Sequence, residues 1–300
     1  MARQDFELSK EPDPPRPEAR DSRMALVVTS SSLFRLTLTV GLAVVISIAA
    51  VTLRANNQHN HCETYLEAPA EVTLVAHAGG GLPEGDYSNS KEALDQSAAN
   101  GLRLFELDFN WTADDELAIV HDWNREYRYW HHLDWTDWLA SHFVAPSSAR
   151  FHASTPKYGL TRLSLETLFE WLRANPGRII TDIKGGNIEG LALIASLAGP
   201  LQNRFVPQIY SAAEYQAVRQ MGYEDIILTT YRLSLSPESL REIDELDLFA
   251  VTVPEKQVEA AADIISKNRI FTHTINTPIN LTAAGYYTDC LIPAETRNGV

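Results

Sequence analysis

Short apolar runs alternate with helix-forming stretches along the chain after residue 70. This alternation is typical of an α/β fold with a parallel sheet, because parallel strands need a crossover, usually a helix, between them. We predict nine strands, at 72–76, 103–109, 117–121, 178–183, 205–210, 226–230, 249–253, 270–275 and 285–288.

Helix-start and helix-stop signals lie between many of these runs. One helix is expected to begin near Asn89 and to stop at Gly101. Ser164 is expected to cap a second helix, and Ser236, followed by a proline, a third.

The nine predicted strands are one more than a (β/α)8 barrel contains. The run 117–121 follows 103–109 too closely for a crossover, which needs about a dozen residues or more. We therefore expect 117–121 to pair as a hairpin or irregular strand. No fixed-period repeat or second domain boundary is visible, so the prediction is one α/β domain at 71–300, a TIM-type (β/α)8 barrel preceded by one N-terminal transmembrane helix.

The first seventy residues differ in composition from the rest. Residues 1–23 are rich in charge and proline and are predicted to be a disordered tail. Within 24–54, the segment 36–53 holds 18 residues without a charge, long enough for a membrane anchor. A cleaved signal peptide and a buried soluble helix are the alternatives. Residues 55–70 are interpreted as a linker.

Charge distribution bears on topology and partners. Arginines are more frequent before the apolar segment than just after it, which predicts a cytoplasmic N-terminus and a periplasmic or extracellular domain on a single-pass cell-membrane protein. After residue 54, 18 Lys/Arg face 33 Asp/Glu, a net charge of −15. So acidic a domain is a poor nucleic-acid binder, and we expect no nucleic-acid partner.

Titratable side chains gather where four predicted strands end. Glu106 and Asp108 alternate along one strand and so project to the same face, as do Asp182 and Lys184 on another. In a barrel they would share the carboxyl-end rim, where active sites lie. Three converging carboxylates need a cation, and their hard oxygen ligands suit one Mg²⁺ or Ca²⁺.

Two histidines also follow strands, His77 and His121. Beside a metal-held phosphodiester, one histidine can accept a proton from the attacking oxygen while the other donates one to the leaving alkoxide.

An ordered series of motifs over about residues 71–293 resembles the glycerophosphodiester phosphodiesterase family. The motifs are His77-Ala78-Gly79-Gly80, Ser88-Asn89-Ser90, Glu92-Ala93-Leu94, Glu106-Leu107-Asp108, Asp114, Val120-His121-Asp122, Thr181-Asp182-Ile183-Lys184, Thr272-His273-Thr274-Ile275-Asn276 and Tyr287-Thr288-Asp289. The resemblance implies a TIM barrel that hydrolyses a glycerophosphodiester to glycerol phosphate and an alcohol.

The resemblance also implies roles for individual residues. His77 and His121 match the catalytic histidines, and Lys184 matches a cation beside the phosphate. The metal ligands matched are Glu106, Asp108 and Asp182.

Two departures from the family pattern concern the phosphate and the metal. Ala78 stands where the family usually has an arginine that helps hold phosphate, so Lys184, Arg125 or Arg128 would have to replace it. Asp182 stands where glutamate is common in the family; in having an aspartate there, the chain resembles the related spider-venom sphingomyelinases D. A phospholipase acting on lysophospholipid or sphingolipid, through a cyclic phosphate, is therefore an alternative, and a non-catalytic metal-binding barrel is a third.

The stretch 123–160 is a long aromatic insertion with histidines at 131, 132, 142 and 152, none of which we assign to metal. It is interpreted either as a lid that selects the alcohol, with aromatic faces suited to choline, or as a satellite core. Cys62 and Cys290 flank the barrel; pairing and two separate thiols are both open.

Overall fold

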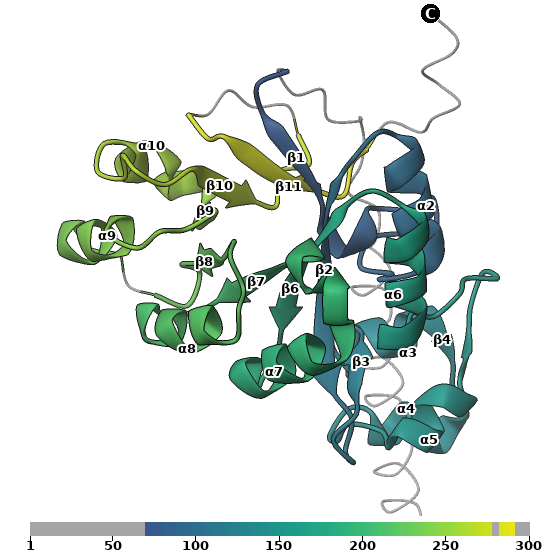
Figure 1. Ribbon diagram of the computed structural model, residues 1–300. Coiled ribbons are helices and arrows are strands. Elements are labelled where there is room, and N and C mark those ends of the chain that lie inside the picture. The colour runs from purple at the N-terminus through teal and green to yellow at the C-terminus, as the bar shows by residue number, and fades with distance from the viewer. Residues whose placement is uncertain (1–69, 234, 278–281, 292–300) are drawn as a thin grey trace, which may run out of the picture. The chain divides into compact units, whose positions relative to one another are not determined.

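The computed structural model describes residues 70–233, 235–277 and 282–291. Eight parallel strands form a closed barrel: β1 (Thr73–Ala76), β2 (Leu104–Trp111), β6 (Arg178–Ile183), β7 (Phe205–Ile209), β8 (Ile227–Thr229), β9 (Ala250–Pro254), β10 (Ile270–His273) and β11 (Gly285–Thr288). The strands follow one another in sequence order, and β1 closes the ring by pairing with both β2 and β11 (Figure 1). The predicted barrel is confirmed.

The ninth predicted strand lies outside the ring. β3 (Leu117–Ile119) pairs antiparallel with the end of β2, and the Val120 amide continues the pairing by donating to the Asp108 carbonyl at 3.0 Å. The expected hairpin is therefore confirmed, and it turns the chain back from the carboxyl end of β2 to the level of Asp108.

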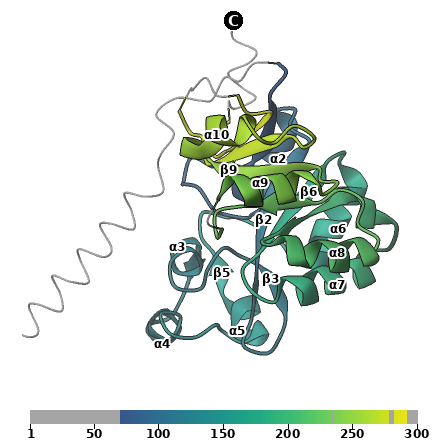
Figure 2. The same cartoon turned by 90° about the vertical axis from the view of Figure 1, so that its left-hand side faces the viewer.

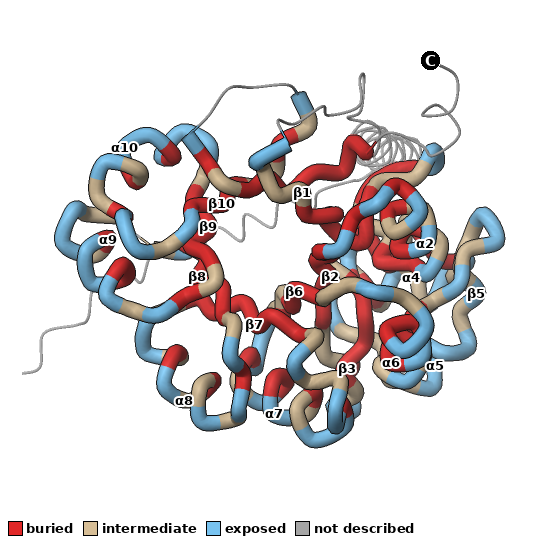
Figure 3. The backbone as a smooth tube through the Cα atoms, turned by 45° about the horizontal axis from the view of Figure 1, so that its top comes forward, coloured by how far each residue is buried: buried red, intermediate tan, exposed pale blue. Residues whose placement is uncertain are grey.

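Helices cover the outside of the barrel (Figure 2). The α-helices of the crossovers are α2 (Lys91–Ala99), α6 (Leu165–Ala174), α7 (Asn187–Ala198), α8 (Tyr215–Gln220), α9 (Pro237–Asp244) and α10 (Val258–Ala262). Short 3₁₀ turns are η1 (His77–Gly79), η2 (Gly199–Arg204), η3 (Ala212–Glu214) and η4 (Glu255–Gln257). Figure 3 shows the consequence for burial: a ring of buried strands is surrounded by helices with exposed outer faces.

The two predicted helix caps, Ser164 and Ser236, are present, and Ser90 caps a third helix. The side-chain oxygens of Ser90, Ser164 and Ser236 each accept a backbone N–H in the first turn of α2, α6 and α9. Such caps satisfy amides that have no partner within the helix.

Apolar side chains pack on both faces of the sheet. Each barrel strand contributes one buried side chain to an interior layer, formed by Val75, Leu104, Ile180, Val206, Ile227, Ala250, Phe271 and Tyr287. The opposite face packs against the helices, for example Phe105 against Trp171 of α6 at a centroid distance of 5.2 Å. With its base filled, the barrel is a rigid support for the polar groups at its rim.

The insertion 123–160 folds as a small unit on the hairpin. It contains α3 (Glu126–Trp130), β4 (His131–His132), α4 (Trp135–Ala140), α5 (Ser148–Ala153) and β5 (Thr155–Pro156). Trp123, Tyr127 and Phe151 form a buried cluster with Ala118 and Val120 of the hairpin. The aromatic side chains of this cluster therefore form a satellite core.

Several predictions fall outside the described residues: the tail 1–23, the anchor 24–54, the linker 55–70 apart from Ala70, and Cys62. Among the helices that the structure describes, none is both long enough and apolar enough to cross a bilayer. Cys290 is buried and disulfide-bonded.

Candidate active site

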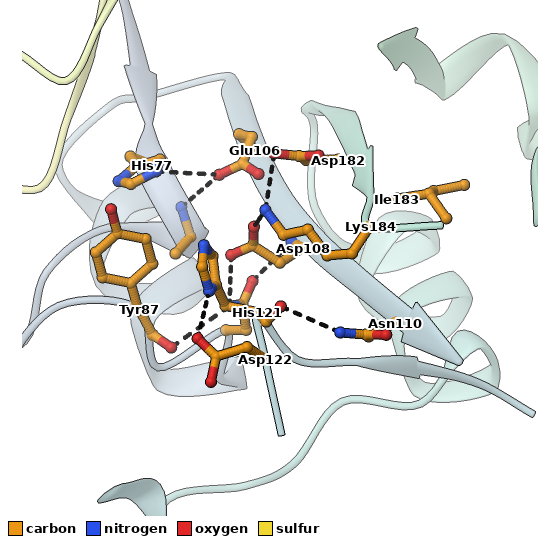
Figure 4. Close-up of polar contacts among 12 residues, drawn as sticks. His77, Tyr87, Glu106, Asp108, Asn110, His121, Asp122, Asp182, Ile183 and Lys184 are labelled. Carbon is orange, nitrogen blue, oxygen red and sulfur yellow. Dashed lines mark hydrogen bonds and ion pairs between the residues drawn. The ribbon is translucent and has the colours of Figure 1, made fainter. Parts of the chain in front are cut away.

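Three carboxylates converge at the carboxyl end of the barrel. Glu106 and Asp108 lie on the same face of β2, and Asp108 is the register partner of Asp182 on β6. One oxygen from each of the three side chains lies within 4.8 Å of the others. The period-two alternation of strands thus brings the three predicted metal ligands together (Figure 4).

Glu106 carries the clearest sign of an absent partner. Its Oε2 accepts the Ala78 amide at 2.8 Å, whereas its Oε1 is buried and has no hydrogen-bond partner among the described residues. Burial, followed by repulsion from Asp108, raises the pKa of Glu106 to about 8. A cation would satisfy this oxygen and favour the charged carboxylate.

Lys184 lies between the other two acids. Its Nζ is 2.7 Å from Asp108 Oδ1 and 2.9 Å from Asp182 Oδ2. Burial disfavours both charges, but the pair with Asp108 dominates, lowering the pKa of Asp108 and raising the pKa of Lys184. Lys184 is at the site as expected, but its charge is already shared by two carboxylates.

Asn89 orients Asp108. Its side-chain N–H donates to Asp108 Oδ2 at 2.9 Å, and its side-chain oxygen accepts the Asp108 amide, also at 2.9 Å. Asn89 belongs to the Ser88-Asn89-Ser90 motif, but no role was predicted for it from the sequence. Its positive φ of 49° puts it in the left-handed region that asparagine tolerates better than most residues.

His77 lies in η1, directly after β1, and is held by an acid from the opposite end of the chain. Its Nδ1 lies 2.8 Å from Asp289 Oδ1, and the second oxygen of Asp289 accepts a hydrogen bond from the side-chain Nδ2 of Asn276 at 2.7 Å. The Nε2 of His77 faces Glu106 at 3.9 Å. Burial opposes protonation, but Asp289 outweighs it and raises the pKa of His77 to about 10.

His121 has a similar support from a different element. It follows the hairpin, and its Nδ1 lies 2.9 Å from Asp122 Oδ2. The other oxygen of Asp122 accepts the amides of Arg125 and Glu126 at the start of α3. Each predicted catalytic histidine therefore has a carboxylate at Nδ1, which leaves Nε2 for the site.

Tyr87 joins the two histidines. Its ring makes edge contacts with His77 at a centroid distance of 4.7 Å and with His121 at 4.9 Å (Figure 4). The tyrosine fixes the spacing of the two imidazoles, and nothing in the sequence pattern pointed to it.

The carboxylate cluster fits one divalent cation. Hard cations bind carboxylate oxygens at about 2.0–2.6 Å, so ligands on one ion lie up to about 5 Å apart. The 4.8 Å separation meets this condition, and the partnerless Glu106 oxygen provides a free donor. Of the acid, histidine and cysteine groups in the described residues, this is the one cluster of three or more with such a geometry. Occupancy would require the Lys184 ammonium to move away from at least one acid.

The two loop arginines proposed to replace the missing arginine are otherwise engaged. Arg125 pairs with the buried Glu126 carboxylate at 2.6 Å, and its guanidinium lies 5.9 Å from the Tyr87 ring centroid. Arg128 stacks over Trp138 and donates to the Asn124 carbonyl. Ala78 is fully buried, and its contribution is the amide that holds Glu106.

Fold and site together define a class: parallel (β/α)8 barrels with a carboxylate cluster that fits a cation, flanked by two histidines. Solved structures of similar fold include a glycerophosphodiester phosphodiesterase from Parabacteroides distasonis, with a TM-score of 0.55 and 16% identity over 77% of this chain and 97% of that one. A putative glycerophosphoryl diester phosphodiesterase from Agrobacterium tumefaciens has a TM-score of 0.54 and 17% identity over 76% and 97%. A putative glycerophosphodiester phosphodiesterase from Galdieria sulphuraria has a TM-score of 0.55 and 14% identity over 76% and 98%.

No protein-family model matches the sequence, and no curated protein matches it. At these identities the likeness concerns the fold alone. The chain has the barrel fold of solved glycerophosphodiester phosphodiesterases, and the match covers nearly the full length of those chains.

Proposed function

We propose that the protein is a metal-dependent phosphodiesterase of the glycerophosphodiester phosphodiesterase family. It hydrolyses glycerophosphodiesters to glycerol phosphate and an alcohol. The observation that carries this proposal is the convergence of the Glu106, Asp108 and Asp182 carboxylates with two histidines whose Nδ1 atoms are held by acids. The shared fold supports it.

In the proposed reaction, the two imidazoles act on opposite sides of the phosphate. One Nε2 takes the proton of the attacking water, and the other gives a proton to the departing alkoxide. Asp289 and Asp122 hold the rings in position and stabilise their protonated forms. Tyr87 keeps the imidazoles apart, so that both can face one phosphate.

The cofactor in this proposal is one Mg²⁺ or Ca²⁺ held by Glu106, Asp108 and Asp182. When bound, the cation offsets the charge that develops on the phosphate oxygens. Ionised carboxylates are the ligands, so the ion replaces the proton that Glu106 would otherwise keep up to about pH 8. Lys184, released from part of its pairing, then lies beside the phosphate.

Incubation of the purified full-length chain with a panel of glycerophosphodiesters and Mg²⁺, Ca²⁺ or Mn²⁺ tests the activity. We expect glycerol phosphate to be released, the H77A variant to be inactive, and H132A, at an exposed histidine of the insertion, to be active. Absence of product with every substrate and metal, or full turnover by H77A, would refute the proposal.

A lipid substrate is the second candidate, favoured by apolar side chains on the insertion. Trp135, Leu139 and Phe143, four residues apart, are 76%, 48% and 81% exposed. Such exposed apolar side chains suit contact with a lipid surface. A lysophospholipid or sphingolipid could then be cleaved by attack of its own hydroxyl. Phosphorus NMR separates the two reactions, because a cyclic phosphate signal would replace that of glycerol phosphate.

The proposed location is the cell membrane, with residues 24–54 as a single-pass anchor, a cytoplasmic N-terminus and an exported barrel. The uncharged stretch and the arginine bias in the sequence support it. Fractionation and protease protection of intact cells test it: release of the full-length chain into the soluble fraction, or an inaccessible barrel, would contradict it.

A further inference from the structure

A phosphate bound at the mouth of the barrel needs a positively charged side chain that is not already paired with a carboxylate. A phosphodiester carries a negative charge, whereas one divalent cation and Lys184 together only balance the charges of Glu106, Asp108 and Asp182. Lys184 is paired with two of these acids, and Arg125 with Glu126. Neither offers a fully available positive charge.

The Arg232 side chain offers an available positive charge. It follows β8 at the carboxyl end of the barrel and is exposed. Within the described residues, no carboxylate forms an ion pair with it. Its guanidinium carbon lies 4.1 Å from the ring centroid of Tyr210 and 5.3 Å from that of Tyr231.

Tyr210 links Arg232 to the acidic cluster. The Tyr210 hydroxyl donates to Asp182 Oδ1. One tyrosine ring therefore separates the guanidinium of Arg232 from a proposed metal ligand.

The aromatic rings also restrict the conformational freedom of the Arg232 side chain. Tyr231 makes edge contacts with Tyr210 at 6.0 Å and with His273 of β10 at 5.6 Å, which builds an aromatic wall along the ends of β7, β8 and β10. A guanidinium held against such rings loses less freedom on binding, and its planar fork matches two oxygens of a phosphate.

We propose that Arg232 is the phosphate-binding arginine of this protein. It contacts the non-bridging oxygens of the scissile phosphate from the β8 side, opposite the histidines, and takes over the task that Ala78 cannot perform. The proposal rests on the proposed function, since it assumes a phosphodiester at the cluster. The ligand class it predicts is a phosphate monoanion or dianion.

The first test compares three variants by steady-state kinetics on a glycerophosphodiester. Losing charge-assisted hydrogen bonds to a phosphate corresponds to about a ten- to hundredfold weaker interaction. We expect R232Q to raise KM by this factor, R232K to recover part of it, and R241Q, at an exposed arginine of α9, to leave KM unchanged. A KM change shared by R232Q and R241Q would overturn the proposal.

The second test does not need turnover. Calorimetry of inorganic phosphate and glycerol 3-phosphate binding to the metal-loaded full chain should show a matching loss of affinity in R232Q, with the melting temperature unchanged. Unaltered phosphate affinity in R232Q, or a loss seen in R125Q instead, would refute the assignment. If the wild type hydrolyses no diester but R232Q still loses phosphate binding, the proposed activity fails while the phosphate site stands.

Discussion

Asn89 and Asp108 are joined by two reciprocal hydrogen bonds of 2.9 Å, one through each side of the asparagine amide. The pair fixes the carboxylate that has the least freedom in the cluster, since Asp108 is buried and its other oxygen meets Lys184.

Removal of the two Asn89–Asp108 hydrogen bonds should weaken metal binding more than it reduces the stability of the fold. Asn89→Gly deletes both hydrogen bonds while glycine accepts the left-handed backbone at no steric cost. Loss of a ligand's supporting hydrogen bonds lowers metal affinity by about ten- to a hundredfold. Titration of Mg²⁺ and Ca²⁺ by calorimetry measures this, with Asn175→Gly at the end of α6 as the control. An unchanged affinity in Asn89→Gly would show that Asp108 is not oriented by it.

Substrates with different leaving groups should distinguish the acid and base roles of the two histidines. Loss of a general acid or base costs about 10²- to 10⁴-fold in rate. An alkoxide needs a proton to depart, whereas p-nitrophenolate does not. We therefore expect H77A and H121A both to lose activity on glycerophosphodiesters, and one of them to regain it on a p-nitrophenyl phosphodiester. Equal loss on both substrates would contradict a division into acid and base.

Glu106 should destabilise the metal-free protein at high pH. Its pKa is raised by burial to about 8, so the folded state retains a proton that the unfolded chain releases near pH 4.5. The resulting stability is complete below pH 4.5 and is lost as pH rises through 8. In EDTA, E106Q should therefore melt at or above the wild-type temperature at pH 8.

The melting temperature of E106Q should not depend on added metal. Mg²⁺ or Ca²⁺ should raise the melting temperature of the wild type, because ligands that bind only the folded state stabilise it. E106Q should show little or no rise. Equal metal-induced shifts in both proteins would exclude Glu106 as a ligand.

His131 should make the insertion sensitive to acid. Burial, and then Arg162, lowers the pKa of His131 to about 3, and its Nδ1 meets the Tyr127 carbonyl. The unfolded chain binds a proton near pH 6.5, so stability is present above pH 6.5 and falls as pH drops toward 3, by up to about 1.4 kcal/mol per pH unit.

Urea unfolding at pH 7 and pH 5 measures this effect. Relative to H131F, which keeps an aromatic ring against Tyr127 and Phe151, the wild type should lose more stability between the two pH values. Identical losses would show that the ring is accessible to protons in the folded state.

The barrel and its acidic cluster could be predicted from sequence because both follow from strand periodicity. Alternation puts Glu106 and Asp108 on one face, and the carboxyl ends of parallel strands share one rim, which brings in Asp182. These relations need no knowledge of loop conformation. The hairpin was predictable for a similar reason, since its loop is too short for a crossover.

The supporting residues were not predictable because loops place them. Tyr87 reaches both histidines from a loop, where its own φ is positive, and Asp289 contacts His77 across 212 residues of sequence. Arg232 lies against the rings of Tyr210 and Tyr231, which come from two different loops. Asp289 lies in one of the sequence motifs, but no local pattern assigns a role to it, to Tyr87 or to Arg232.

The hairpin gives the two histidines different dependence on the rest of the molecule. His77 is attached to a barrel strand, whereas His121 is carried by β3, which is anchored to the barrel through β2 and packed on the other side by Trp123, Tyr127 and Phe151. Substitutions in the insertion should thus affect His121 more than His77. Changes in chemistry or substrate range could arise there without remodelling the eight-stranded scaffold.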